Sequence, residues 1–482
     1  MNLTEYASYD ALGLAELVAK RQVSPKELAQ TAVAAREKVD PAVRSVVELY
    51  PDRIEGLDEK SLGNGPFRGV PFLIKDVFGH EKGRKIEFGS RLCAGMTVEV
   101  GTYLVDLLKA AGVNILGRSA APEYSMAATT ESVMFGNTSN PWKHGYSAGG
   151  STGGGQAAVT AGIVPIAHGS DIGGSIRIPA SWCGGVGLKP SRQRISSGPV
   201  VDEGGWGYSM NFVQVKTVRD AAAMLDCLAI PQPGDPFIIP KPDEPYAALA
   251  SKPAPKLRIG IVLDELVGMK VDPEVARAVE AAGKTLAGMG HTVERASVDL
   301  GGLDMLTAAF EVFFFGFDVR LDGYAKRSGH KVGPDTLEPV ILDVYEWSKS
   351  IGPARFIAAC GTLNLVRRKL GAFYTKHDIW LSPTTARVSE PWGRYNLSRP
   401  GVGTHNMRDE LFKPPCQYTL PHNVMGTPAM SLPLAMHSSG LPIGVQLAAK
   451  PAAEHLLLQL AAALEEAMPW KERIPPLHVS RM

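Results

Sequence analysis

The chain contains GGSTGGG at residues 149–155 and GSDIGGSIRIPA at residues 169–180, two glycine-rich segments that each carry a serine. Glycine loses more backbone entropy on folding than other residues. A cluster is therefore tolerated mainly where the chain needs positive φ angles or where another group must approach the backbone closely. We expect these segments to form functional loops rather than ordinary core.

Each segment offers backbone N–H groups next to a serine hydroxyl. Ser175 follows two glycines just beyond a predicted strand at residues 164–167, and Ser151 lies 24 residues upstream. Backbone amides that turn inward can stabilise the oxyanion of an acyl-transfer reaction, which is often the largest catalytic contribution. One such loop alone is better explained as a tight glycine-rich turn with an incidental serine. Because a helix and a strand separate the two loops, both can return to one sheet edge, and we expect a shared site.

The hydrophobic pattern around these segments alternates between helix and strand. Residues 8–20 and 24–39 have apolar side chains at helical spacing, and Ser24, Pro25 and Glu27 form a helix-start signal. The alternation predicts an α/β fold. Further helices are expected at residues 103–111, 156–161, 217–228, 273–289 and 453–467, and strands at 69–74, 113–116, 164–167, 256–263, 292–298, 380–382, 429–434 and 443–447.

These motifs resemble the amidase signature family, and the resemblance extends over most of the chain. It runs from about residue 66 to the C-terminus and is least diagnostic between residues 200 and 419. It implies the amidase signature fold, an α/β fold in which helices cover both faces of a large mixed central β-sheet. The motifs that carry it, besides the two glycine-rich segments, are GVP at 69–71 followed by Lys75-Asp76, GNT at 136–138, NPW at 140–142, CG at 183–184, GLKP at 187–190, NVMGTPA at 423–429 and GLPIGVQ at 440–446.

The resemblance also implies a single amidase domain over residues 1–482. Its signature core is expected at about 66–200 together with about 420–470, and a variable region at about 200–419 is expected to shape the substrate site.

Residue by residue, the resemblance assigns a catalytic set. It makes Ser175 the acylated nucleophile, Lys75 the base, and Ser151 a bridging serine that follows a cis peptide bond and relays the proton. The chemistry of these residue types agrees, because a serine hydroxyl is a poor nucleophile unless a base removes its proton. Lysine can be that base only when neutral, which burial favours by lowering its pKa. Asp76 adjoins Lys75, but on an extended segment its side chain points to the opposite face.

The same resemblance gives roles to residues around the reacting groups. Thr152 stands where many members have a second serine, which keeps a hydroxyl but adds a methyl group. Asp171 and Arg177 flank the nucleophile and are expected to brace its loop rather than react. The oxyanion hole is expected to be formed by the backbone amides of Ile172, Gly173, Gly174 and Ser175.

The substrate pocket is expected to be apolar, with aromatic residues 206, 208, 313–315 and 317 as further candidate lining. Ile178 stands where the glutamine-hydrolysing subunits of tRNA-dependent amidotransferases usually have Gln. The hypothesis is therefore an amidase for apolar acyl amides or anilides, including xenobiotic-type amides, and its C-terminal motifs are similar to the branch that contains 6-aminohexanoate-cyclic-dimer hydrolases and aryl acylamidases. The alternative is a glutamine-hydrolysing amidotransferase subunit. The residues expected to touch the substrate are Met126, Thr129, Gly149, Gly150 and Ile178.

Motifs of other enzyme classes match this sequence less well. Residues 145–149 match the G-x-S-x-G elbow of α/β hydrolases, with Ser147 as nucleophile, but no strand is predicted directly before them. Neither a G-x-x-x-x-G-K-[ST] loop nor an H-E-x-x-H motif occurs, so neither a cofactor nor a metal is expected.

The composition limits the partners and the compartment. Lys plus Arg total 50 and Asp plus Glu total 49, so the net charge of +1 is too small to attract nucleic acid, and the expected partners are a small amide and water. The five cysteines contain no C-x-x-C pair, which favours a reducing cytoplasm. The N-terminus lacks a signal-peptide layout, and the apolar stretch at 308–317 is too short for a membrane span. A homodimer is left open.

Overall fold

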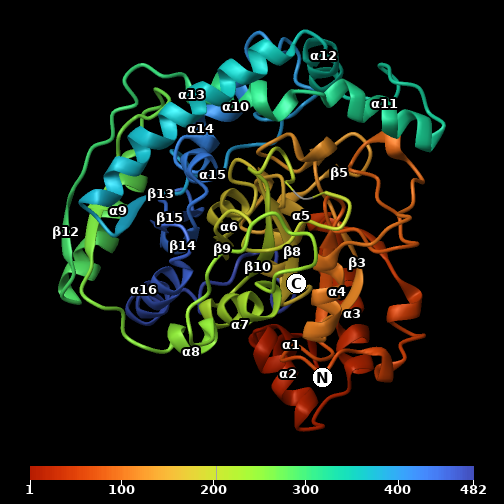
Figure 1. Cartoon of the computed structure of the whole chain (residues 1–482). Coiled ribbons are helices and arrows are strands. Elements are labelled where there is room, and N and C mark those ends of the chain that lie inside the picture. The colour runs from red at the N-terminus through yellow and green to blue at the C-terminus, as the bar shows by residue number, and fades with distance from the viewer. Residues whose placement is uncertain (202) are drawn as a thin grey trace.

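The computed structural model describes residues 1–201 and 203–482 and is built around one large sheet (Figure 1). Eleven strands of these described residues belong to it. In spatial order they are β1 (Val46–Leu49), β3 (Asn114–Ser119), β2 (Pro71–Lys75), β8 (Ile166–Asp171), β10 (Met210–Val215), β9 (Val186–Lys189), β14 (Ala429–Met436), β15 (Pro442–Ala449), β13 (Ile379–Pro383), β11 (Arg258–Ile261) and β12 (Thr292–Arg295).

The strand directions make the sheet mixed. Strand β2 runs parallel to β3 and β8, and β11 runs parallel to β12 and β13. The neighbouring pairs from β8 through β10, β9, β14 and β15 to β13 are antiparallel. The predicted α/β fold with a large mixed central sheet is therefore confirmed.

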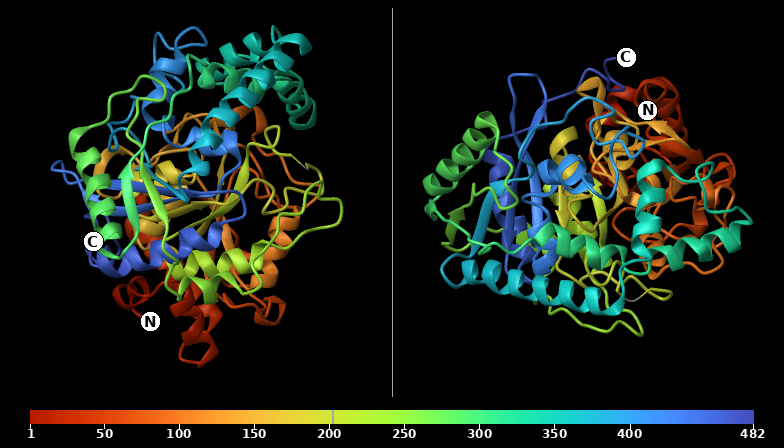
Figure 2. Two further views of the ribbon diagram at one scale, coloured as in Figure 1. Left: turned by 60° about the vertical axis from the view of Figure 1, so that its left-hand side comes forward. Right: turned by 90° about the horizontal axis from the view of Figure 1, so that it is seen from above.

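Helices cover both faces of this sheet (Figures 1 and 2). Helices α5 (Gly153–Thr160) and α6 (Arg177–Cys183) contact each other on one face, whereas α7 (Val218–Leu228) and α16 (Glu454–Ala467) contact each other on the other. The other helices outside the 305–372 segment are α1 (Leu3–Ser8), α2 (Ala11–Ala19), α3 (Pro25–Val43), α4 (Tyr103–Ala111), α8 (Tyr246–Ala250), α9 (Pro273–Gly288), α14 (Lys413–Cys416) and α15 (Leu420–Met425).

Side-chain caps fix where the N-terminal helices begin. The predicted start signal of α3 is confirmed, because Ser24 accepts a hydrogen bond from the Glu27 amide and the Glu27 side chain accepts one from the Ser24 amide. The single helix predicted over residues 8–20 is wrong at its start. Tyr9 is extended, and the Asp10 side chain caps α2 by accepting from the Gly13 amide, so α1 and α2 are separate.

Helix α5 begins three residues earlier than predicted and therefore starts directly after Thr152. Its glycines permit close packing: a Cβ atom on Gly153 would lie 2.4 Å from the Thr130 hydroxyl, and one on Gly154 would lie 2.4 Å from the Ala120 carbonyl oxygen. Only glycine fits at such positions, and the first turn of α5 is thereby held against the segments that follow β3.

A helical layer that the sequence pattern did not predict lies at the top of Figure 1, beyond the α5–α6 face. Its helices α10 and α13 pack against each other, as do α11 and α12. This layer closes one side of the candidate site. It consists of α10 (Met305–Phe314), α11 (Phe317–Ser328), α12 (Pro339–Ser348) and α13 (Pro353–Ala372).

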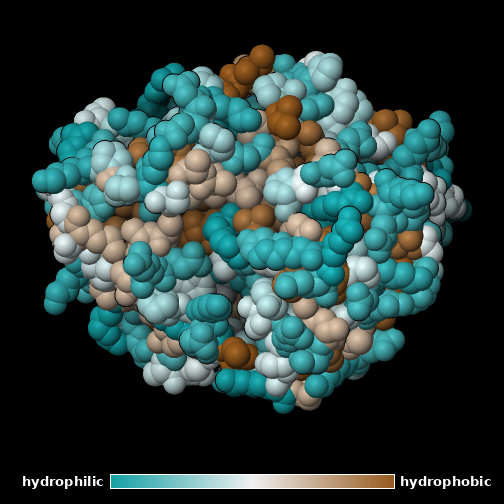
Figure 3. Space-filling view, turned by 90° about the horizontal axis from the view of Figure 1, so that it is seen from below, coloured by the Kyte–Doolittle hydropathy of each residue, from teal (hydrophilic) through white to brown (hydrophobic). Residues whose placement is uncertain are grey.

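The surface seen from below is mainly hydrophilic, with hydrophobic residues gathered in patches between hydrophilic ones (Figure 3). Within the described residues, no helix combines the length and the apolar character needed to cross a bilayer.

Two glycine substitutions test this packing. A Cβ atom on Gly117 in β3 would lie 2.0 Å from the backbone oxygen of Glu48 in β1, whereas Gly361 in α13 has open space around it. We expect Gly117→Ala to lower the free energy of unfolding by about 1–3 kcal/mol through overpacking. Gly361→Ala should raise it by about 0.5–1 kcal/mol. Urea denaturation measures both, and equal effects of the two substitutions would contradict the strand packing.

Candidate functional site

Lys75 lies at the end of β2 and is completely buried. Its Nζ atom is 2.8 Å from Ser151 Oγ, 2.9 Å from Ser170 Oγ and 3.1 Å from Thr152 Oγ1. Three hydroxyl groups therefore surround this amine. Ser151 and Thr152 come from the loop before α5, whereas Ser170 lies on β8, beside β2.

The environment of Lys75 favours the neutral amine. Burial lowers the pKa of Lys75 well below its ordinary value, although the charge of Asp171 acts in the opposite sense. Asp76 points away from Lys75, as expected from the alternation of a strand, and it pairs with Arg118 and accepts from the Glu87 amide. The amine is thus kept apart from the carboxylate that adjoins it in sequence.

The Ser151 loop is seated tightly. The Gly150–Ser151 peptide bond is cis, as the family resemblance implies. A Cβ atom on Gly150 would lie 2.4 Å from the Thr129 carbonyl oxygen, so glycine is required at this position. The Thr152 amide donates to the Ser175 carbonyl oxygen at 3.2 Å, which joins the two serine loops.

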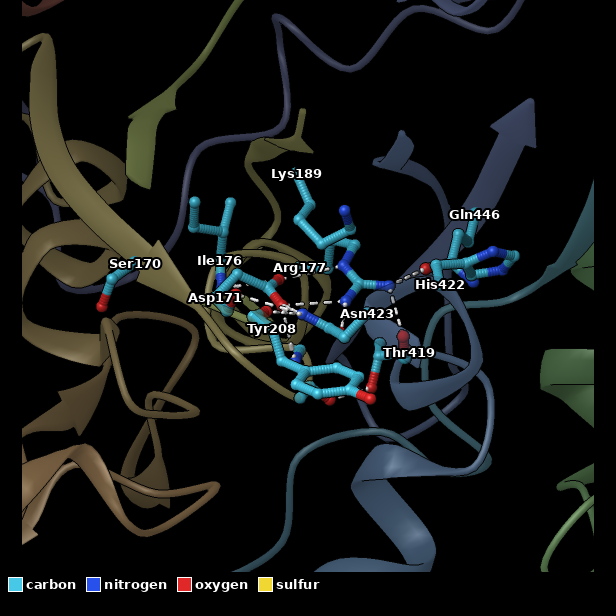
Figure 4. Close-up of polar contacts among 12 residues, drawn as sticks. Ser170, Asp171, Ile176, Arg177, Lys189, Tyr208, Thr419, His422, Asn423 and Gln446 are labelled. Carbon is cyan, nitrogen blue, oxygen red and sulfur yellow. Dashed lines mark hydrogen bonds and ion pairs between the residues drawn. The ribbon is translucent and has the colours of Figure 1, made fainter. Parts of the chain in front are cut away.

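Asp171 holds the turn that carries Ser175, and Figure 4 shows it beside Ile176 and Arg177, which follow that serine. Its carboxylate accepts from the Gly174 amide at 2.8 Å and the Ile176 amide at 3.2 Å, and it forms a two-pronged pair with Arg177 at 2.9 Å. Burial alone would raise the pKa of Asp171, but the Arg177 guanidinium outweighs it and lowers the pKa to about 2. The turn is therefore fixed by a buried carboxylate that stays ionised.

A second ring of contacts ties this pair to the C-terminal segments (Figure 4). Arg177 donates to Gln446 Oε1 and the Thr419 carbonyl, both at 2.8 Å, and to Asn423 Oδ1 at 2.6 Å. Thr419 Oγ1 donates to the Gly173 carbonyl oxygen at 2.5 Å, which fixes the orientation of the Gly173–Gly174 peptide unit. Residues far apart in the sequence thus brace the Ser175 turn.

The predicted oxyanion hole needs a correction at Gly174. The Gly174 amide donates to Asp171, so it is not available to a substrate oxygen. The amides of Ile172, Gly173 and Ser175 have no hydrogen-bond acceptor among the described residues, and all three residues line one pocket. The available donors are therefore these three amides.

This pocket opens beside Ser175 and is mainly apolar. Of the residues expected to contact a substrate, Met126, Gly150 and Ile178 line it. Its far wall comes from the helical layer, whose lining residues include Phe310, Phe313, Phe314, Phe317, Arg320 and Tyr324.

Two residues predicted to contact the substrate lie outside the pocket wall. The buried Thr129 hydroxyl donates to Glu131 and shares a hydrogen bond with Ser147, both at 2.7 Å. Gly149 packs on α6, where a Cβ atom would lie 2.8 Å from Pro179. Both positions support the cis loop from behind.

Several residues of the site were not assigned a role from the sequence. Ser170 and Asn423 lie within the quoted motifs, yet no pattern indicates that one contacts Lys75 and the other Asp171. Thr419 lies outside every motif and was not predicted. Within the described part of the chain, no cluster of His, Cys, Asp and Glu side chains is arranged to hold a metal ion.

Comparisons with known proteins agree with this geometry. The family model described as Amidase matches residues 27–458. The chain is 35% identical over 485 residues to a 6-aminohexanoate-cyclic-dimer hydrolase of Paenarthrobacter ureafaciens, an alignment that covers 97% of this chain and 96% of that protein.

Solved structures give the same result. A structure of 6-aminohexanoate cyclic dimer hydrolase matches with a TM-score of 0.93 and 34% identity, over 98% of this chain and 99% of that chain. A bacterial aryl acylamidase of the amidase signature family matches with a TM-score of 0.85 and 25% identity, over 96% and 97% of the two chains.

The ion pair beneath the Ser175 turn generates a stability prediction. Arg177→Met leaves the buried Asp171 carboxylate without its partner and should lower the free energy of unfolding by about 3–5 kcal/mol. The double variant Asp171→Asn with Arg177→Met removes both charges and should recover part of this loss. Urea denaturation of the parent, the single variant and the double variant measures these free energies. An Arg177→Met variant as stable as the parent would contradict the bracing role.

Proposed function

The chain belongs to the amidase family, and on that premise we propose that it hydrolyses amides of apolar acyl groups through an acyl-enzyme on Ser175. As a family member it is a hydrolase of carbon–nitrogen bonds in amides other than peptide bonds. One observation carries the mechanism: the buried Lys75 amine is 2.8 Å from the Ser151 hydroxyl.

In the proposed acylation step, Ser175 Oγ attacks the substrate carbonyl carbon. Its proton passes to Ser151 Oγ, and the proton of Ser151 passes to the neutral Lys75 amine. The carbonyl oxygen becomes an oxyanion that the free amides of Ile172, Gly173 and Ser175 stabilise. When the tetrahedral intermediate collapses, the proton returns through Ser151 to the leaving nitrogen, the C–N bond breaks, and the acyl group stays on Ser175. Water then attacks this ester by the same relay and releases the acid.

The hydroxyls around Lys75 support a defined direction for its lone pair. A neutral amine has two N–H donors and one lone pair. Thr152 Oγ1 is 3.3 Å from the Ser170 carbonyl oxygen and donates its proton there, so its lone pairs are free to accept from Lys75. If Thr152 and Ser170 accept the two N–H groups, the lone pair faces Ser151, which is the direction that the relay requires.

The pocket supports the proposed substrate class. Ile178 is buried in its wall and the α10 phenylalanines face it, so an apolar acyl chain gains free energy by leaving water there. The similar proteins include a 6-aminohexanoate-cyclic-dimer hydrolase and an aryl acylamidase. We extend the proposal to anilides, to cyclic amides and to xenobiotic amides of this kind. A glutamine-hydrolysing subunit is disfavoured because Ile178 offers no hydrogen bond to a glutamine side chain.

A panel of substrates tests the proposal and its nucleophile. The purified chain alone should release nitroaniline from p-nitroanilides of medium-chain acids, and Ser175→Ala should lower kcat/KM by at least about 10³-fold. A fluorophosphonate should label Ser175 in the parent and in the control variant Ser147→Ala, and should not label Ser175→Ala. No turnover of any anilide, or a label on Ser147, would contradict the proposal.

The pH dependence tests the base. Because its pKa is lowered, Lys75 is neutral above a pH well below 10.5, so kcat/KM should fall only as the pH drops through that lowered pKa. The arginine of Lys75→Arg stays charged at every pH, so this variant should have a kcat about 10²–10⁴-fold lower than the parent. Its remaining activity should show no decrease at low pH from titration of residue 75. Activity that appears only near pH 10 would show an ordinary lysine and overturn the role of Lys75.

A further inference from the structure

Ser125 places a hydroxyl without a partner in the wall of the apolar pocket. Its Oγ atom is buried and has no hydrogen-bond partner in the structure, and Ser125 lines the same pocket as Ser175. Leaving a buried hydroxyl unpaired is costly, and native structures seldom do so without a functional reason.

The backbone keeps this hydroxyl in place. Tyr124 and Ser125 have φ angles of 50° and 60°, two successive non-glycine residues in the left-handed region, which is costly for side chains with a Cβ atom. The backbone amide of Tyr124 donates to the Phe88 carbonyl oxygen. The Tyr124 ring stacks on the rings of Phe88 and Tyr324, with 6.0 Å between the ring centroids in each pair. Surrounding packing therefore holds Ser125 in a conformation that a free chain would avoid.

Two other polar side chains that line the pocket, Tyr124 and Arg320, have contacts of their own, and the ring of a third, Tyr324, stacks on Tyr124. The Tyr124 hydroxyl is 3.5 Å from Cys93 Sγ, and the guanidinium of the exposed Arg320 lies over the Phe317 ring at 6.0 Å. Apolar groups such as Met126, Phe314 and Ile178 make up much of the remaining wall. A ligand that fills this pocket therefore meets a hydroxyl in mainly apolar surroundings.

We propose that Ser125 is a specificity-determining residue that hydrogen-bonds a second amide group in the acyl part of the substrate. The inference rests on the proposed function, because the acyl part is what remains in the pocket after the amine leaves. A hydroxyl donates to a carbonyl oxygen and accepts from an N–H group, so it matches both sides of an amide. A hydrocarbon chain leaves it unpaired, and a charged group would lose its hydration in this apolar wall.

A matched pair of substrates tests the inference. The 6-acetamidohexanoyl and nonanoyl p-nitroanilides have acyl chains of the same length, and only the first has a second amide. The parent enzyme should prefer the acetamido substrate by about 10- to 100-fold in kcat/KM, the effect of pairing a buried hydroxyl. Ser125→Ala should remove this preference by slowing the acetamido substrate and leaving the nonanoyl substrate unchanged or slightly faster.

A stability control separates specificity from structure. Since the hydroxyl makes no hydrogen bond within the protein, Ser125→Ala should unfold within about 2 °C of the parent. Equal effects of Ser125→Ala on both substrates, or no preference in the parent, would overturn the inference while the proposed function stands. If the parent cleaves neither substrate, that result contradicts the proposed function itself, and with it the proposed role of Ser125.

Discussion

The site depends on a buried amine that is kept away from carboxylates. No acidic side chain lies within ion-pair distance of Lys75 among the described residues, although Asp76 is its neighbour and Asp171 lies on the adjoining strand. Each of these carboxylates is instead paired with an arginine, Arg118 on one side and Arg177 on the other. A carboxylate next to Lys75 would stabilise the ammonium form, which cannot act as the proposed base, so these two ion pairs favour the proposed chemistry as well as the fold.

Sheet topology brings the proposed catalytic groups together. Strand β8 lies beside β2, so the end of β8 delivers Ser170 to the Lys75 amine and, within a few residues, leads into the Ser175 turn. The glycines of α5 let the Ser151 loop sit against the same edge. The C-terminal strands add Gln446 behind Arg177, and the helical layer from α10 to α13 adds the apolar wall. The positioning of the site therefore depends on segments that are distant in the sequence, whereas the two proposed catalytic serines lie only 24 residues apart.

The sequence predicts the parts of this structure that depend on local pattern or on motif. The helix at 103–111 and the strands around Lys75 and before Ser175 follow from periodicity, and the opposite orientation of Asp76 follows from strand geometry. What it did not predict depends on three-dimensional contacts. The Gly174 amide is bound by Asp171 because of how the turn folds, and Thr129 is drawn behind the cis loop by Glu131. Helices α10 to α13 lie in the region with the least diagnostic motifs.

Neutron diffraction from crystals grown in heavy water near neutral pH tests the central claim most directly, because it locates the deuterons of the relay. A neutral Lys75 should carry two deuterons, directed at Thr152 and Ser170, and the Ser151 deuteron should point at Nζ. Three deuterons on Nζ, with one directed at Ser151 Oγ, would contradict the claim that Lys75 is the base.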